Sequence, residues 1–518
     1  MPVIGRTIKS TSGWNLLHFR SLHSTAYRRS STVYTDPVPG PDDAIFVAMS
    51  GGVDSSFVAH LLSKQYKNVT GVYMANWTQP RTPRKDIPKM ISPRISGDSE
   101  RLRQYMQEEE KRQAAEVDGG VLCTETEWND VQLVCRDLDI PSIRMSFEKE
   151  YWTDVFEPMI NGFINGNTPN PDVTCNRLIK FGVLYENVEK LAAQKGHKRW
   201  WLAMGHYARI AIHKQTGQYH LLRPRDSSKD QTYYLSTIDS NRMGNILFPL
   251  HCYNKKEIRK MAEAVGLRTA YKPDSHGLCF IQPSVSAEAA AKAHHEGKKI
   301  SSIARGYTHF RDFLREYVTE KEGNIVLLDG TVVGTHPGLW YVTIGQRSGL
   351  NMGSVLPSTA PWYVVDKRVD TNEIVIATGV DNPMSYSSGV ICQWYWMVEQ
   401  GERQNMVTLA QSGQLGFRYR SLHEPMPVKS LAVLPDGKVQ VEFADPAHGV
   451  VCGQYLAVYH GDRVVGSGPI ESKELSYPEE IEKMKQELIL AREQTKQRQQ
   501  TSRIKLRVIK REKASLSM

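Results

Sequence analysis

The sequence predicts an α/β protein of three parts: a doubly wound domain on a parallel sheet, a small central domain and a C-terminal β-barrel. In the first half, short apolar runs typical of buried strands alternate with helical patterns, as in a parallel sheet with helices on both faces. From about Asn324 onward, short β-rich runs are separated by turn residues. The length of 518 residues fits about three domains at roughly 100 to 200 residues each.

The first strand–helix–strand unit is the clearest part of this pattern. The run A-I-F-V-A-M at 44–49 predicts a buried strand, and a turn at 50–55 leads from it into helical spacing of apolar residues. A second strand is predicted at 69–75, and the intervening helix makes the two strands parallel neighbours. The alternation then continues with helices near 129–138 and 176–194 and with strands near 140–147 and up to Gly205.

Changes of composition divide the chain further. Residues 79–120 are Pro-rich and then densely charged, and 284–305 are Ala-rich, so both are interpreted as insertions, the first of them mobile. After Pro478, helix formers give way to basic residues, a pattern that favours a solvated helix over an RNA-contacting arm. We therefore expect a leader at 1–35, a catalytic domain at 36–282 with insertion 79–120, a central domain at 283–352, a β-barrel at 353–470 and a basic helical tail at 471–518.

The net charge of +9, from 65 basic and 56 acidic residues, is concentrated at the two ends of the chain. Residues 1–35 carry five Lys or Arg and no acidic residue, and 496–513 carry eight basic residues and one Glu. The body between them is slightly acidic, so contacts with a polyanion must come from local patches and the tail.

The leader at 1–35 is Ser-rich and free of acidic residues, without a continuous apolar core. These features favour a mitochondrial transit peptide, and so a matrix location, over an unstructured basic terminus. No stretch approaches the roughly 18 apolar residues that span a bilayer, so we expect no membrane insertion.

Seven cysteines are spread along the chain without a C-x-x-C pair, which argues against a disulfide framework or a four-cysteine metal site. Two of them have polar, turn-rich flanks. Cys175 follows N-P-D-V-T at the expected start of a helix, whose dipole should lower the thiol pKa, and Cys279 lies in the turn D-S-H-G-L-C. Brought together, the two thiols could pass on sulfur by disulfide chemistry.

The segment Ser50–Ser56, S-G-G-V-D-S-S, joins a strand to a helix and is the strongest signal for chemistry. Small residues let backbone N–H groups close on an anion, serine hydroxyls add donors, and the following helix N-terminus favours negative charge. A Walker loop is excluded, since G-x-x-x-x-G-K-[ST] does not occur. The segment resembles the PP-loop of ATP pyrophosphatases, which cleave ATP between its α and β phosphates; the alternative is an ordinary glycine turn.

Further motifs follow in a consistent order: N-P-D-x-x-C-N-x-x-I-K-F from Asn170, G-H-Y-A-R from Gly205, K-D-Q-T-Y-Y-L from Lys229, G-x-C-F-I from Gly277 and T-I-G-Q-R from Thr343. With the S-G-G-V-D-S loop they resemble the tRNA-specific 2-thiouridylases, and the leader suits a mitochondrial member. The resemblance covers about 42–470, the two insertions excepted. It implies a PP-loop catalytic domain and a tRNA-contacting central domain.

The resemblance also implies roles for particular residues. Cys175 is the implied nucleophile, Cys279 the implied carrier of a persulfide, and Asp172 the implied acid or base. ATP, with Mg²⁺ whose ligands the sequence does not indicate, would contact Ala48, Met49, Ser50, Gly51, Gly52, Val53, Asp54, Ser55, Met74 and Gly205. tRNA would contact Asn170, Pro171, Asp172, His206, Lys229, Asp230, Gln231, Arg418, Tyr419 and Gln454.

Taken without the resemblance, several of these residues have structural interpretations. His206 could be a satisfied histidine at a strand end, and 229–231 could be a polar turn. Arg418 and Tyr419 could be ordinary strand residues.

The implied reaction is 2-thiolation of the wobble uridine of tRNA. Adenylation of the uridine C2 oxygen makes it a leaving group, and sulfur from a persulfide donor protein then replaces it, giving 2-thiouridine, AMP and pyrophosphate. Two alternatives stay open: a PP-loop ligase that adenylates a small molecule, and a noncatalytic RNA-binding protein. The sequence does not indicate the oligomeric state, the donor protein or the particular tRNAs.

Overall fold

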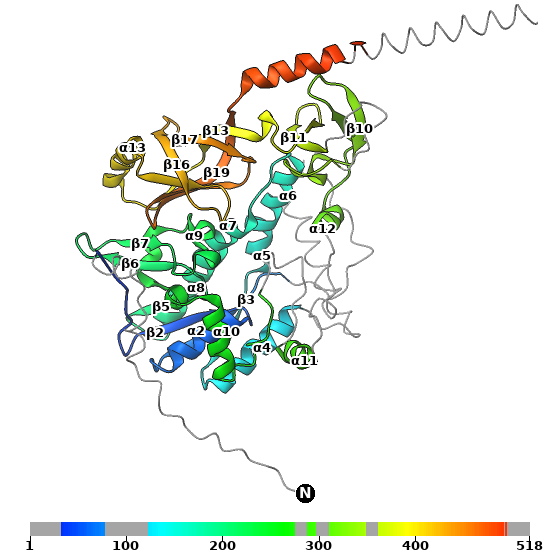
Figure 1. The fold of residues 1–518 in the computed structure, drawn as a ribbon. Helices are drawn as coiled ribbons and strands as arrows, with labels where there is room; N and C mark the ends of the chain where they lie inside the picture. Colours follow the sequence, from blue (N-terminus) through cyan, green and yellow to red (C-terminus); the bar gives the residue numbers. More distant parts are fainter. Residues whose placement is uncertain are drawn as a thin grey trace, which may run out of the picture.

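The computed structural model describes residues 33–77, 123–274, 287–296, 310–348, 361–491 and 493–494. In Figure 1 the parallel-sheet domain lies at the bottom, the C-terminal β-barrel at the upper left and the central domain at the upper right. The leader residues 1–32, the insertion 79–120, Cys279 and the tail beyond 494 lie outside the described residues. None of the described helices is long and apolar enough to cross a membrane.

Five parallel strands form the sheet of the first domain: β2 (Ala44–Met49), β3 (Val69–Ala75), β4 (Ser142–Ser146), β5 (Trp200–Ala203) and β8 (Ile246–Leu247). Their order is β4-β3-β2-β5-β8. The chain leaves β2 toward one edge of the sheet and later returns to β5 on its other side. The gap between the carboxyl ends of β2 and β5 is thus a topological switch point, where open α/β sheets bind ligands.

Strand β2 shows why this sheet needs helices on both faces. All six of its residues are buried, and alternate side chains point to opposite faces. Phe46 and Ala48 join one apolar cluster, and Ile45, Val47 and Met49 join the other. The second face is covered by α2 (Val53–Ser63), α4 (Cys123–Asp137) and α10 (Lys255–Ala264), which contribute to the same cluster as Met49.

The first face is covered by two long segmented helices. One comprises α5 (Glu148–Tyr151), η2 (Trp152–Phe156) and α6 (Glu157–Ile164), and the other α7 (Pro171–Cys175), η3 (Asn176–Val183) and α8 (Leu184–Gln194). The second begins five residues before the start predicted at residue 176. Asn170 caps it, because its side chain accepts a hydrogen bond from the Val173 backbone N–H. Cys175 therefore lies inside the helix and not at its mouth.

The rest of this domain is a hairpin and short helices. The hairpin consists of β6 (Arg209–His213) and β7 (Tyr219–Leu222), with β1 (Tyr34–Thr35) at its edge. The short helices are η4 (Ser227–Lys229), α9 (Thr232–Leu235), η5 (Ser240–Asn245) and η6 (Pro249–Cys252). Helix α10 starts with a reciprocal capping box between Asn254 and Glu257.

The central domain holds a four-stranded sheet of order β10-β9-β12-β11. Its strands are β9 (Gly323–Val326), β10 (Val332–His336), β11 (Trp362–Arg368) and β12 (Glu373–Thr378), and the described helices nearby are α11 (Ala287–His295), α12 (Phe310–Tyr317) and η8 (Leu339–Tyr341). Strands β11 and β12 fall inside the range predicted for the barrel, 353–470. They pair instead with β9, because the parallel β9–β12 register completes this sheet. Strand pairing therefore places the end of the central domain near 378.

The C-terminal unit is a barrel closed by six strands, since β19 pairs with both β13 and β18. Its elements are η9 (Pro383–Ser385), β13 (Tyr386–Cys392), β14 (Tyr395–Trp396), η10 (Gln400–Glu402), α13 (Arg403–Gln411), β15 (Leu415–Arg418), β16 (Met426–Val433), β17 (Val439–His448), β18 (Tyr455–His460) and β19 (Arg463–Leu475). Arg463 of β19 also pairs with Leu222 of β7, so the barrel sheet continues into the catalytic domain.

A helix follows the barrel over 478–491 and lies beside the central domain in Figure 1. Met484 and Leu488 of this helix pack against a buried cluster that includes Val326 and Val375. The prediction of a purely solvated helix is therefore wrong for its described part. The helix has a core to join, and that core belongs to a domain more than a hundred residues earlier in the chain.

Candidate functional site

The loop after β2 is held closed by its own hydroxyl groups. The backbone N–H of Ser50 donates to Oγ of Ser55 at 3.2 Å, and the hydroxyls of Ser55 and Ser56 donate to the carbonyl oxygen of Gly52 at 3.2 and 2.8 Å. Gly51 has φ of +68°, a left-handed conformation that favours glycine. This glycine and serine loop precedes α2, so the N-terminus of that helix faces the switch point.

A second glycine brings the end of β5 against the same loop. A Cβ atom at Gly205 would lie 3.0 Å from the backbone N of Ser55 and 3.1 Å from the carbonyl carbon of Asp54. A side chain at this position would force the loop backbone to shift, so glycine permits the close approach. Ala48 and Met49 at the end of β2 adjoin the loop in sequence, and Met74 lies near the carboxyl end of the neighbouring β3. The predicted nucleotide residues therefore converge on one edge of the sheet.

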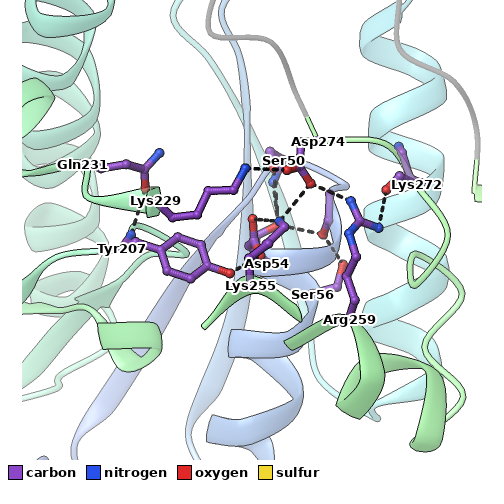
Figure 2. Close-up of polar contacts among 12 residues, drawn as sticks. Ser50, Asp54, Ser56, Tyr207, Lys229, Gln231, Lys255, Arg259, Lys272 and Asp274 are labelled. Atoms are coloured by element: carbon purple, nitrogen blue, oxygen red, sulfur yellow. Dashed lines mark hydrogen bonds and ion pairs between the residues drawn. The ribbon is translucent and has the colours of Figure 1, made fainter. Parts of the chain in front are cut away.

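Charged side chains join this loop to a segment more than 200 residues away, as Figure 2 shows. The carboxylate of Asp54 accepts hydrogen bonds from the Tyr207 hydroxyl at 3.0 Å and from Lys255 Nζ at 2.6 Å. The Asp274 carboxylate lies 3.0 Å from the Nζ atoms of Lys255 and Lys229. We call Asp54, Tyr207, Lys229, Lys255, Arg259 and Asp274 the loop network.

Arg259 completes the loop network from helix α10, with its Nη2 atom 2.5 Å from Asp274 Oδ1. Burial would raise the Asp274 pKa, but hydrogen bonds from Lys229, Lys255 and Arg259 outweigh burial and hold it well below its usual value. Three cations therefore surround one carboxylate beside the glycine loop. An incoming phosphate could use the same cations.

The loop contacts and cations fit the triphosphate of ATP. Small residues leave room for close backbone approach, and the loop network supplies positive charge at a helix N-terminus. Among the described residues, no three His, Cys, Asp or Glu side chains gather as metal ligands.

Cys175 is a free thiol in the apolar cluster that covers the first face of the sheet, with 7% of its surface exposed. Burial raises its pKa to about 11; the nearby Lys180 charge acts in the opposite direction, and Asp172 adds to the increase. The prediction that a helix N-terminus lowers this pKa is therefore wrong. Burial dominates because the thiol is the fifth residue of the helix, beyond the first turn where the dipole acts.

Asp172 lies one turn earlier on the same helix. Burial raises its pKa, an effect that Lys180 partly offsets. A carboxyl group with a raised pKa takes up a proton more readily than an ordinary carboxylate, which suits the acid or base role implied for Asp172.

His206 follows Gly205 directly and contacts the helix segment η3 that follows Cys175. Its ring lies 5.9 Å from Phe181 of η3 and 5.7 Å from Phe248, between ring centroids. Burial, with a contribution from Lys180, lowers its pKa well below the usual value, so the ring is neutral. Its Nδ1 atom and the Oδ1 atom of Asn176 are buried without a hydrogen-bond partner among the described residues. These two polar atoms are candidates for contact with a base.

The segment Asn170–Asp172 meets the barrel directly. The Asn170 side chain donates to Oε1 of Gln454 at 3.3 Å, and Nε2 of Gln454 donates to the carbonyl oxygen of Thr168 at 2.7 Å. The structure thus brings together two predicted tRNA-contacting residues that lie 284 positions apart. Next to them, the Arg177 guanidinium stacks over the Tyr395 ring, 3.6 Å from its centroid.

Three other predicted tRNA contacts, Asp230, Arg418 and Tyr419, have buried side chains. Arg418 Nη1 lies 2.7 Å from Asp230 Oδ2, and both side chains are almost fully buried. Tyr419 is also buried, with its hydroxyl donating to the His448 carbonyl oxygen at 2.9 Å. In this conformation the Arg418–Asp230 ion pair joins the barrel to the catalytic domain. Arg418 is the last residue of strand β15, as the structural interpretation expected, whereas Tyr419 follows the strand. Direct contact of these side chains with tRNA stays a prediction.

The remaining predicted tRNA contacts, Lys229 and Gln231, lie in or next to the loop network. Lys229 is part of the loop network, and Gln231 Oε1 accepts the Tyr207 backbone N–H at 2.8 Å. Sequence reasoning missed Tyr207, Lys255 and Lys180. Tyr207 and Lys180 stand inside the quoted motifs, whereas Lys255 stands in none of them. Cys279 lies outside the described residues.

The fold and this site define the class of protein. A parallel sheet with a glycine- and serine-rich anion loop at its switch point is a HUP-type, PP-loop nucleotide-binding domain, here joined to two β domains. Family descriptions match all three parts: "tRNA methyl transferase HUP domain" at 43–95 and 96–283, "tRNA methyl transferase PRC-barrel domain" at 311–378, and "Aminomethyltransferase beta-barrel domain" at 390–470.

Similar proteins narrow the class further. The "Mitochondrial tRNA-specific 2-thiouridylase 1" of Saccharomyces cerevisiae is 35% identical over 455 residues, 86% of this chain and 95% of that protein. The protein of the same name from Schizosaccharomyces pombe is 33% identical, over 84% and 92%. The "tRNA-specific 2-thiouridylase MnmA" of Lactobacillus helveticus is 36% identical, over 83% and 95%. This chain belongs to the tRNA-specific 2-thiouridylase family.

Proposed function

We propose that this protein is an ATP-dependent tRNA-uridine 2-sulfurtransferase that makes 2-thiouridine at the wobble position. The observation that carries the proposal is the short path between loop and thiol. Gly205 packs against Ser55, His206 follows it, and the charge of Lys180 acts on both His206 and Cys175. A nucleotide-activating loop linked in this way to a nucleophilic sulfur suits activation of a base followed by sulfur transfer.

In the proposed reaction, the uridine C2 oxygen attacks the α phosphorus of ATP, and pyrophosphate leaves. The loop amides at Ser50–Ser55 and the cations of the loop network would hold the phosphates in line and stabilise the developing charge. Mg²⁺ would accompany ATP. A wobble base is single-stranded, so it can be turned out into the site at modest cost.

Sulfur transfer would then involve the two predicted thiols. The terminal sulfur of a Cys279 persulfide attacks C2, and AMP leaves. The Cys175 thiolate attacks the inner sulfur of that persulfide, the S–S bond breaks, and its electron pair remains on the 2-thiouridine. A Cys175–Cys279 disulfide results, and an external dithiol reduces it. The persulfide is renewed by a donor protein.

The mitochondrial names of the two fungal relatives, with the acid-free leader at 1–35, support a mitochondrial location and, more narrowly, the matrix. We further propose three functional units: the nucleotide domain to about 282, a central tRNA-contacting domain to about 378, and the barrel to about 470. The helix at 478–491 would then brace the central domain.

Mass spectrometry of nucleosides tests the proposal. Purified protein with tRNA, ATP and a persulfide donor should form 2-thiouridine and AMP, and Cys175→Ser should abolish 2-thiouridine. The matched control is Cys135→Ser, because Cys135 is a free buried thiol on the opposite face of the sheet. Unchanged 2-thiouridine in Cys175→Ser would contradict the proposal. ATP-dependent adenylation of a small molecule without any need for tRNA would favour the ligase alternative.

A further inference from the structure

The helix that carries Cys175 changes its winding directly after the thiol. Segment η3 is a π-helix, whose backbone hydrogen bonds join residues five apart, so each turn holds more residues than an α turn. In an α-helix, Leu178 and Ile179 would lie over Cys175. The wider turn moves Lys180, five residues on, toward the helix face that carries Cys175 and, one turn earlier, Asp172.

Two contacts keep the helix in this wider winding. A Cβ atom at Gly182 would lie only 3.1 Å from the carbonyl oxygen of Arg177, five residues earlier, so glycine allows the π turn to close. Arg242 donates from Nη1 to the carbonyl oxygens of Phe181 and Gly182 at 2.8 and 3.1 Å. The register of Lys180 is therefore supported from outside the helix, by a residue of η5.

Lys180 differs from the other lysines near the site in having no partner. Lys229, Lys255 and Lys272 each pair with a carboxylate at 3.0 Å or less. Within the described part of the chain, the Lys180 side chain makes no hydrogen bond and no ion pair. Its charge acts instead on three groups of the site, Asp172, Cys175 and His206. Leaving a partly buried cation unpaired costs free energy, so such a cation is a candidate to stabilise an anion that forms during function.

Cys175 is such a group, because the thiolate and not the thiol is the nucleophile. Burial disfavours the thiolate, and the Asp172 carboxylate on the same helix disfavours it further. The His206 ring is neutral and brings no charge to the thiol. Among the described residues, Lys180 is the one group whose charge favours the thiolate.

We propose that Lys180 is a positioning residue that stabilises the Cys175 thiolate during sulfur transfer, a role that rests on the proposed function. The Cys175 thiol gives its proton to the Asp172 carboxylate. The thiolate forms a bond to the inner sulfur of the Cys279 persulfide, the S–S bond to the uridine-bound sulfur breaks, and Asp172 returns the proton to the 2-thiouridine. Lys180 contributes its charge and takes no part in the proton transfer.

The test measures the titration of Cys175 in the full chain without tRNA or ATP. Thiolate absorbance in the ultraviolet is taken as the difference between each protein and the same protein carrying Cys175→Ser. We expect Lys180→Met to hold about tenfold less Cys175 thiolate at a given pH, the usual effect of losing a nearby opposite charge. Lys180→Arg should recover most of it, since the charge is kept.

The matched control is Lys190→Met, which removes an exposed lysine from α8, the continuation of the same helix. It should leave the titration unchanged. An equal titration midpoint in wild-type protein and folded Lys180→Met would overturn the proposal. If Lys180→Met does not fold, Lys180→Gln takes its place, with thermal melting compared with that of Lys180→Arg.

The kinetics of sulfur transfer give an independent test of the role of Lys180. Lys180→Met should lower kcat by about tenfold with the KM for ATP unchanged, and raising the pH should recover part of the loss. A merely structural role would change stability and KM and leave the pH profile in place. The thiol titration needs no substrate, so its outcome stands even if the protein proves not to thiolate tRNA. If Lys180→Met shifts the Cys175 titration as expected but the wild-type protein forms no 2-thiouridine, only the proposed function is rejected.

Discussion

Two polar regions of the catalytic domain differ in how their charged and polar groups are paired. In the loop network, and in the Asp230–Arg418 pair beyond it, each carboxylate meets at least one cation within 3.0 Å. Around Cys175, the Lys180 ammonium, the His206 Nδ1 atom and the Asn176 Oδ1 atom have no partner among the described residues.

This difference separates two uses of polar groups. Paired charges fix segments that are distant in the chain, since breaking a buried pair leaves a charge without compensation. Polar groups without partners weaken the fold and are kept where a reacting group needs them. Substitutions in the first region should therefore reduce stability or nucleotide binding, and substitutions in the second should change chemistry at nearly constant stability.

The largest effect on stability is expected from the buried pair. Arg418→Met leaves the Asp230 carboxylate buried with less compensation, so it should destabilise the junction of barrel and catalytic domain by about 3–5 kcal/mol. Urea denaturation with circular dichroism measures this. The control Arg420→Met removes an exposed arginine and should cost less than about 1 kcal/mol. Equal destabilisation by the two variants would contradict the structural role of the pair.

The second-largest effect is expected from a substitution in the loop network, and it should appear in the use of ATP. Lys255→Met removes the cation shared by Asp54 and Asp274, and it should lower kcat/KM for ATP by on the order of 100-fold, as loss of a charge-stabilising donor does. Lys256→Met, at the exposed neighbouring position of α10, should match wild type. AMP formation in the presence of tRNA is the measurement. A wild-type kcat/KM for ATP in Lys255→Met would show that the loop network does not contribute to catalysis.

A smaller effect is expected from Gly205→Ala. The added methyl group would meet backbone atoms of Asp54 and Ser55 at about 3 Å and push the loop away from β5. We expect roughly tenfold weaker ATP use, about 1.4 kcal/mol, with the Cys175 titration unchanged. Gly401→Ala is the control, because a methyl group there meets no atom within 4 Å. A shifted thiol titration in Gly205→Ala would show that the two regions are not separable.

The smallest effect concerns pH. The folded state holds His206 neutral with a lowered pKa. The unfolded chain therefore binds the extra proton first, and this contribution to stability, present above about pH 6.5, is lost as the pH falls below it. His206→Phe should lessen the acid loss measured by urea denaturation at about pH 5.5 against about pH 7.5, whereas the exposed His423→Phe should not. An unchanged pH dependence in His206→Phe would place that ring in water.

The sequence by itself determined the class of fold and the nucleotide loop. Strand β2 and the S-G-G-V-D-S-S loop follow from apolar runs, glycines and serines that are local in the chain, so neighbouring residues alone specify them. The motifs around Cys175 and Gly205 are also local in the chain, and they indicated the family. What the sequence misjudged were boundaries: the start of the Cys175 helix, set by the Asn170 cap, and the membership of β11 and β12, set by pairing with β9.

Only the tertiary structure decided which groups meet and how they ionise. Asp54 meets Lys255 across 201 positions, and Asn170 meets Gln454 across 284. Cys175 titrates according to its burial, and the helix position that the sequence displays does not decide it. Burial and long-range charge pairing depend on how distant segments pack, and that information is spread over the whole chain and is not contained in any one motif.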